Sequence, residues 1–174
     1  DAFTAICRWL EADGPHRILA LGPLTNIAAV ALARPDLAAR VSDLVWMGGG
    51  VTSGNHTASA EFNALADPEA LAIVIAHGLP LRMVDLAELI ADMFAGYISI
   101  ATSRGRPGMA IYDPSAAVAF VAPDIVSFRP ARIDVELHGS LTRGRTVVET
   151  RATHATLNAQ FATDIDADRA RAII

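Results

Sequence analysis

The hydrophobic positions of this chain follow two alternating patterns. Short, largely apolar segments that end at a polar or Gly-rich loop predict buried strands over 17–21, 43–47 and 81–85. Apolar residues at helical spacing, Asp-Pro start signals and an acid-capped end predict helices over 2–12, 26–33, 36–40, 68–77, 87–103, 114–121 and the last residues of the chain. This alternation favours an α/β fold with a mostly parallel sheet and helices on both faces.

A different pattern follows near the end of the chain. Residues 132–137 and 145–149 alternate between apolar and polar side chains, and the loop HGSLTRG separates them, which predicts a late antiparallel hairpin. No internal repeat or interdomain linker is visible, so we expect residues 1–174 to form a single domain. Ligands of parallel sheets bind beyond the carboxyl ends of the strands, so the loops after the three predicted strands are the places to search for a site.

Composition and charge exclude several classes of protein. Hydrophobic residues make up 52% of the chain, but the longest apolar runs, 27–33 and 116–122, are far shorter than the roughly 20 residues of a membrane span. The net charge is −5 and no basic block occurs, which argues against a nucleic-acid-binding face. The single Cys7 is expected in the core. With no signal-peptide pattern, these features predict a cytoplasmic protein.

The loop after the second predicted strand carries the most informative polar residues. Three glycines, 48–50, either form a tight turn or let a ligand approach the backbone. In the sequence AEFN, Glu61 and Asn63 share one side of an extended segment, and Phe62 is expected to anchor the other side to the core. A carboxylate beside an amide suits the vicinal hydroxyls of a sugar. The alternative is a capping role near the next helix, although Asp67 already supplies a cap there.

Eight short motifs occur in an order that is specific as a set and covers nearly the whole chain. They are LGPLTNIA (21–28), MGGG (47–50), GN (54–55), AEFN (60–63), DPEA (67–70), GLPLRMV (78–84), DPSAAVAF (113–120) and HGSLTRGRTVV (138–148). Together they resemble the nucleoside hydrolases of the inosine–uridine-preferring type. The resemblance implies an α/β fold and cleavage of the N-glycosidic bond of purine or pyrimidine ribonucleosides, which gives ribose and a free base.

The resemblance also implies a cofactor, a set of site residues and a quaternary structure. A Ca²⁺ ion would bind the ribose 2′- and 3′-hydroxyls and the attacking water. Ribose-binding side chains are expected at Met47, Asn55, Glu61 and Asn63, and calcium ligands at Asp113 and at the backbone carbonyl of Leu21. The family is commonly oligomeric, so a homo-oligomer is expected. A small-molecule nucleoside would be the substrate, with no nucleic-acid or membrane partner.

Two departures from the family pattern change these expectations. The family's D-x-D-x-x-x-D-D signature, which supplies most calcium carboxylates, has no counterpart here. We therefore expect the chain to be the C-terminal portion of a hydrolase domain, with weak or absent calcium binding and little activity alone. The alternatives are a degenerate, non-catalytic member that binds ribose, a nucleoside or a partner, and a chain that needs a separate segment to supply the carboxylates.

The second departure is Tyr112, which stands where the family often has a His before the calcium Asp. Tyr112 is either a replacement for the acid that protonates the leaving base or a wall of the pocket. Asp113 is either a metal ligand or the N-cap of a helix that begins at Pro114. Elsewhere, Trp9 and Trp46 are expected in the core and His16 on the surface. The choice between purine and pyrimidine is expected to depend on the segments after 85 and before 112.

Overall fold

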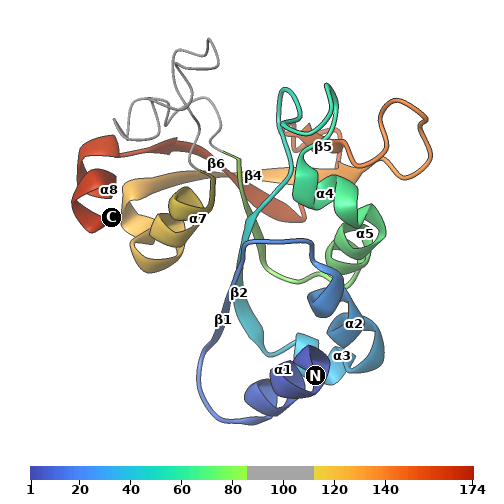
Figure 1. The fold of residues 1–174 in the computed structure, drawn as a ribbon, viewed down its shortest axis with the longest axis vertical. Coiled ribbons are helices and arrows are strands. Elements are labelled where there is room, and N and C mark those ends of the chain that lie inside the picture. Colours follow the sequence, from blue (N-terminus) through green and yellow to red (C-terminus); the bar gives the residue numbers. More distant parts are fainter. Residues whose placement is uncertain (86–111) are drawn as a thin grey trace.

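Six strands form one sheet in the order β1-β2-β3-β6-β4-β5 in the computed structural model of the chain, which describes residues 1–85 and 112–174 (Figure 1). The strands are β1 (His16–Ala20), β2 (Val41–Met47), β3 (Leu81–Val84), β4 (Val126–Val135), β5 (Thr146–Glu149) and β6 (Ala159–Ile165). β1, β2, β3 and β6 run parallel to one another, whereas β4 runs antiparallel to both β6 and β5. The predicted mostly parallel sheet and late hairpin are confirmed.

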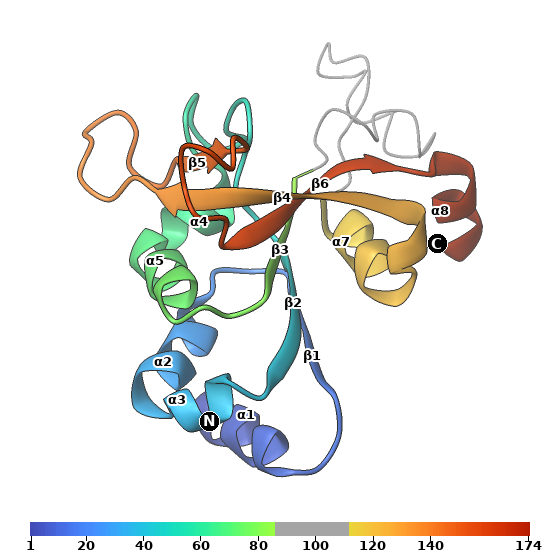
Figure 2. The same cartoon turned by 180° about the vertical axis from the view of Figure 1, so that it is seen from behind.

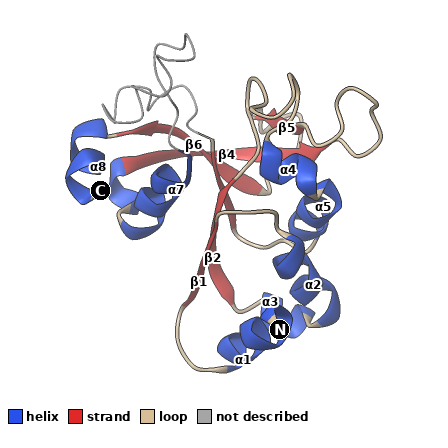
Figure 3. Cartoon of the chain, viewed as in Figure 1, coloured by secondary structure: helices blue, strands red, loops and turns tan. Residues whose placement is uncertain are grey.

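Helices cover both faces of this sheet, as predicted (Figures 2 and 3). One face carries α1 (Ala2–Glu11), α2 (Thr25–Ala33), α3 (Pro35–Ala38), α4 (Phe62–Ala66) and α5 (Pro68–Ala76). The other carries α7 (Tyr112–Val121), the short 3-10 helix η1 (Pro123–Ile125) and α8 (Ala167–Ile173).

The alternation along β2 explains why that strand is apolar throughout its second half. Leu44 and Trp46 belong to the core cluster beneath α1 to α5, whereas Val45 and Met47 belong to the cluster beneath α7 and α8. A central strand of a parallel sheet is buried on both faces, so both sets of side chains must be apolar. None of the helices in the described part of the chain is long and apolar enough to cross a membrane.

The predicted helix-start signals work locally as expected, with one difference. Asp67 accepts a hydrogen bond from the backbone N–H of Ala70 at 3.0 Å, and Pro68 begins α5. α7, however, begins at Tyr112, so Asp113 lies within its first turn and is not a cap before Pro114. The predicted helix over 87–103 lies outside the described residues.

The sequence patterns missed α4 and the strand β6. α4 lies within a stretch that was expected to be a loop. The sequence AQFATDI of β6 interrupts its apolar residues with polar ones, so it shows no continuous run. In the structure β6 nevertheless lies between β3 and β4, where Phe161 joins one core cluster and Ala162 the other.

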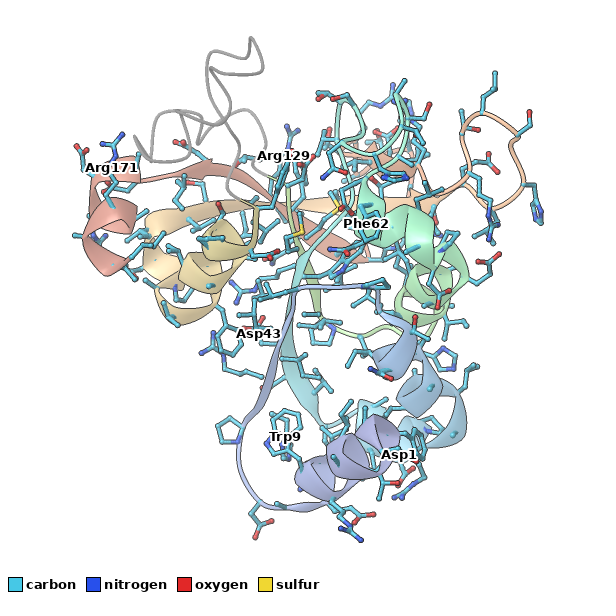
Figure 4. All side chains as sticks on the ribbon, in the orientation of Figure 1. Asp1, Trp9, Asp43, Phe62, Arg129 and Arg171 are labelled. Carbon is cyan, nitrogen blue, oxygen red and sulfur yellow. The ribbon has the colours of Figure 1, made fainter. Side chains whose placement is uncertain are left out.

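Two expectations need correction, one about Trp9 and one about His16. Trp46 is fully buried, as predicted, but Trp9 is 41% exposed (Figure 4). Trp9 packs edge-on against His16, with the ring centroids 4.7 Å apart, and His16 is buried rather than on the surface. The two rings thus shield part of each other from solvent at the start of β1, since each packs an apolar surface against the other. Cys7 is buried and unpaired, as expected.

Candidate active site

The carboxyl ends of β1 and β2 meet at a buried amide. Asn63, in the first turn of α4, is 7% exposed. Its Nδ2 donates a hydrogen bond to the backbone oxygen of Met47 at 2.9 Å and lies 3.4 Å from the backbone oxygen of Leu21. One side chain therefore joins the ends of two neighbouring strands, at the edge of the sheet where a ligand is expected.

Glu61 lies beside Asn63 and is 3% exposed. Its Oε1 accepts a hydrogen bond from the backbone N–H of Asn63 at 2.9 Å, and its Oε2 accepts from Gly49 at 2.8 Å and from Ala64 at 3.1 Å. Glu61 is the N-cap of α4, so the capping alternative is real but concerns a helix other than the one beginning at Pro68. The carboxylate also fixes the turn that follows β2.

The expected orientation of Phe62 is wrong. Glu61 and Asn63 are both buried, but they do not belong to an extended segment as predicted, because Glu61 is the N-cap of a helix that begins at Phe62. Phe62 itself is 53% exposed. Its ring packs edge-on against exposed His56, with centroids 5.3 Å apart. The physical reason is that several buried backbone N–H groups of the turn and of α4 need acceptors, and this need outweighs the burial of one ring. Exposed Asn55 accepts from the backbone N–H of Phe62 at 2.9 Å through its Oδ1.

The glycine turn after β2 is tightly enclosed. Gly49 has a φ of +76°, and a Cβ there would lie 2.5 Å from the Sδ of Met83. The turn interpretation of the glycines therefore holds, and close packing is a second reason for them. Side chains from three separate segments of the chain accept hydrogen bonds from successive N–H groups of this turn: Glu61 from Gly49, Thr146 from Gly50 at 2.8 Å, and Asp85 from Val51 at 3.0 Å.

Sequence reasoning missed two of these three anchors. Asp85 is the last residue of the predicted strand 81–85 and directly follows the observed strand β3, so its place at a strand end was a usable signal. Thr146 offered none, because it lies 96 residues from Gly50 and alternates normally within a strand.

Leu21 and Asp113 lie on a common apolar hollow beside this cluster. The hollow has a volume of about 360 Å³, and its lining includes Leu21, Asp113, Pro114, Val121, Ile173 and Ile174. Both Leu21 and Asp113 are exposed, whereas Tyr112 is half-buried and packs against the core beneath α7 and α8. The structure thus places the Leu21 backbone oxygen near Asn63 and places Leu21 and Asp113 on one hollow, whereas Tyr112, at the start of α7, is not among the residues that line it.

The donor set does not fit a complete calcium site. Ca²⁺ takes about six to eight oxygen ligands, several of them carboxylates. Asp113 and the Leu21 carbonyl supply two oxygen-bearing groups, and the described residues contain no group of three His, Cys, Asp or Glu side chains that could hold a metal ion. By themselves these residues therefore lack the ligands that calcium requires.

Comparison with known proteins identifies the family. The profile described as inosine-uridine preferring nucleoside hydrolase matches residues 1–172. The chain belongs to this family. The non-specific ribonucleoside hydrolases RihC of Salmonella typhi and Salmonella enteritidis are each 31% identical to it over 182 aligned residues. The match covers 91% of this chain and 58% of each relative, so the chain spans less than two thirds of the relatives' length.

Solved structures agree with this family assignment. The purine-preferring ribonucleoside hydrolase from Gardnerella vaginalis matches with a TM-score of 0.81 and 27% identity over 98% of this chain and 62% of that protein. The inosine-uridine preferring nucleoside hydrolase from Bacillus anthracis matches with a TM-score of 0.79 and 23% identity over 98% of this chain and 63% of that one. The second likeness supports the fold alone. The resemblance of the eight ordered motifs to the nucleoside hydrolases is confirmed.

Proposed function

We propose that this chain carries the ribose-binding part of a ribonucleoside hydrolase, which cleaves the N-glycosidic bond to give ribose and a free base. The observation that carries the proposal is the cluster of Asn63, Glu61 and Met47 at the carboxyl ends of the parallel strands, with Asn55 at its edge. The names of the relatives support the same activity.

In the part of the chain that the structure describes, two polar atoms of this cluster are free to form hydrogen bonds with the hydroxyl groups of a sugar. Asn63 uses its Nδ2 on Met47, and among the described residues its Oδ1 has no partner, so Oδ1 is left to accept a bond from a ribose hydroxyl. Asn55 uses its Oδ1 on the backbone of Phe62, so its Nδ2 is left to donate. Glycosidic cleavage develops positive charge on the sugar ring, and a ribose held by fixed groups needs less reorganisation to reach that state.

Other residues would contact the leaving base and the metal ion. Tyr112, the first residue of α7, either donates a proton to the base or packs against it; both roles are compatible with its half-buried position. Calcium would be held by Asp113 and the Leu21 carbonyl together with oxygen ligands from outside the described residues. For this chain alone we keep the sequence-based expectation of weak calcium binding and little turnover. We also keep the proposal that residues 1–174 form one part of a longer hydrolase domain. A cytoplasmic location also stays a prediction.

The test of the proposed function is calorimetric titration of the purified chain with D-ribose, with and without Ca²⁺. We expect ribose binding, weakened about tenfold by Asn55→Ala through loss of a polar contact to the sugar. Gln160→Ala is the matched control, because this exposed amide lies near the start of β6 and lines a separate hollow together with Ser42 and Asp43. Absence of ribose binding by the unaltered chain, or equal losses in both variants, would count against the ribose site.

Self-association is a further part of the proposal. Among the described strands β1 pairs with β2 on one edge alone, and its carboxyl end borders the hollow where Val121, Ile173 and Ile174 are exposed. A free strand edge beside exposed apolar side chains favours association with a second copy.

Sedimentation should therefore show a dimer or larger species at micromolar concentration. Val121→Asp should shift this species to the monomer, because a charge replaces an apolar contact in the hollow. Val147→Asp, at an exposed position of the hairpin, should not. A monomer at every concentration of the unaltered chain would refute self-association.

A further inference from the structure

We propose that Thr146, on β5, is a positioning residue for the ribose site and acts by holding the turn after β2. The inference rests on the proposed function, because the side chains it would position are those assigned to ribose. Thr146 touches none of the atoms assigned to the sugar. Its effect would pass through the backbone of Gly50.

The contact between Thr146 and Gly50 is double. The Thr146 hydroxyl accepts a hydrogen bond from the backbone N–H of Gly50 at 2.8 Å and donates one to the backbone oxygen of Gly50 at 2.6 Å. A hydroxyl can donate and accept at once, so one side chain satisfies both polar groups of this residue. Thr146 is 2% exposed, so water does not readily replace it, and its loss would leave a buried donor and acceptor unpaired.

From Gly50 the turn leads directly to the proposed ribose residues. The neighbouring Gly49 donates to Glu61 at 2.8 Å, and Met47 accepts from Asn63 at 2.9 Å. The position of the turn and the positions of the Glu61 and Asn63 side chains therefore depend on one another. If Gly50 is released, the backbone groups that orient Glu61 and Asn63 lose one of their fixed points.

The hairpin that carries Thr146 is itself anchored. Thr146 lies opposite Val135 in the antiparallel pair of β4 and β5. Near the loop of the hairpin, Arg143 binds both carboxylate oxygens of Glu69 on α5, at 2.7 and 2.8 Å. This contact lowers the pKa of Glu69 below its ordinary value. Thr146 is thus presented from an element held to both the sheet and a helix, which suits a positioning role better than a loop would.

The test compares Thr146→Val, which keeps the branched shape and removes the hydroxyl, with Thr146→Ser, which keeps the hydroxyl. NMR would follow hydrogen exchange at the Gly50 amide and the side-chain amide signal of Asn63, and calorimetry would follow D-ribose binding. In Thr146→Val we expect about tenfold faster exchange at Gly50, a shifted Asn63 signal and about tenfold weaker ribose binding. Thr146→Ser should restore all three.

Thr163→Val is the matched control, since Thr163 also donates to a backbone oxygen, that of Ser127, at 3.2 Å, but on the surface of β6. It should leave all three observables unchanged. If Thr146→Val leaves the Gly50 and Asn63 signals unchanged, or if it weakens ribose binding no more than Thr163→Val does, Thr146 has no positioning role. If the unaltered chain does not bind ribose while the Asn63 signal still responds to Thr146→Val, the proposed function fails and the coupling stands.

Discussion

Glu61→Ala should lower the free energy of unfolding by about 3 kcal/mol and remove measurable ribose binding. The Glu61 carboxylate accepts from the backbone N–H groups of Gly49, Asn63 and Ala64, and alanine would leave all three without that acceptor. The loss of the α4 cap accounts for about 1 kcal/mol, and the buried unpaired N–H groups account for the rest. The same change frees the turn after β2 and the first turn of α4, so the proposed ribose residues lose their common support.

Urea unfolding followed by circular dichroism, with ribose titration of each variant, measures both effects. Glu11→Ala is the matched control: Glu11 pairs with Arg34 at 3.2 Å on the surface, and its loss should change stability by less than about 0.5 kcal/mol. Glu61→Gln should fall between the two, because its –NH₂ group would face an N–H that needs an acceptor. Equal stabilities of Glu61→Ala and Glu11→Ala would mean that the bonds to Glu61 have little net effect.

Trp46→Ala should lower the free energy of unfolding by about 4 kcal/mol. The side chain is fully buried on β2, in the core beneath α1 to α5, and its Nε1 donates to the backbone oxygen of Gly22 at 3.0 Å. Alanine would leave a large cavity and an unpaired carbonyl in the loop that follows β1. Because that loop begins with Leu21, the damage should extend to the proposed metal and ribose residues.

Trp9→Ala is the size-matched comparison for this prediction. Trp9 is partly exposed and covers His16, so its removal should cost about 1 kcal/mol. Circular dichroism serves for both variants, since fluorescence would lose one of its two tryptophans. If Trp9→Ala lowers the free energy of unfolding as much as Trp46→Ala does, burial of Trp46 at the centre of the sheet does not contribute the large stabilisation expected here.

The parts of the fold predicted from the sequence are those in which local pattern and final environment agree. β2 and β3 are short, largely apolar segments because they are buried on both faces, and α5 begins where Asp67 and Pro68 indicate. β6 was missed because Gln160, Thr163 and Asp164 interrupt its apolar residues, so it lacks the largely apolar pattern by which a central strand is recognised. The position of β6 in the sheet is set by its pairing with β3 and β4, and a local sequence pattern does not reveal such long-range pairing.

The candidate site divides in the same way. The sequence singled out Glu61 and Asn63 together, but it treated them as part of an extended segment, whereas Glu61 caps a helix that begins at Phe62. The direction in which the two side chains face depends on buried N–H groups of the turn after β2 and of α4. Phe62 therefore faces outward against its hydrophobic character. Thr146 reaches Gly50 across 96 residues, and contacts of this kind follow from topology alone.

The position of β6 between β3 and β4 has a consequence for how the chain assembles. The central parallel strands and the β4–β5 hairpin are both bridged by β6, the last strand in the sequence. During synthesis on a ribosome, the inner edges of β3 and β4 remain unpaired until residues 159–165 have emerged. Long-range pairing of this sort slows folding, and the waiting edges are open to aggregation in the meantime. A nascent chain that ends before β6 would hold the parallel strands and the β4–β5 hairpin as two separate parts, so the two parts of the described sheet are joined in a single step.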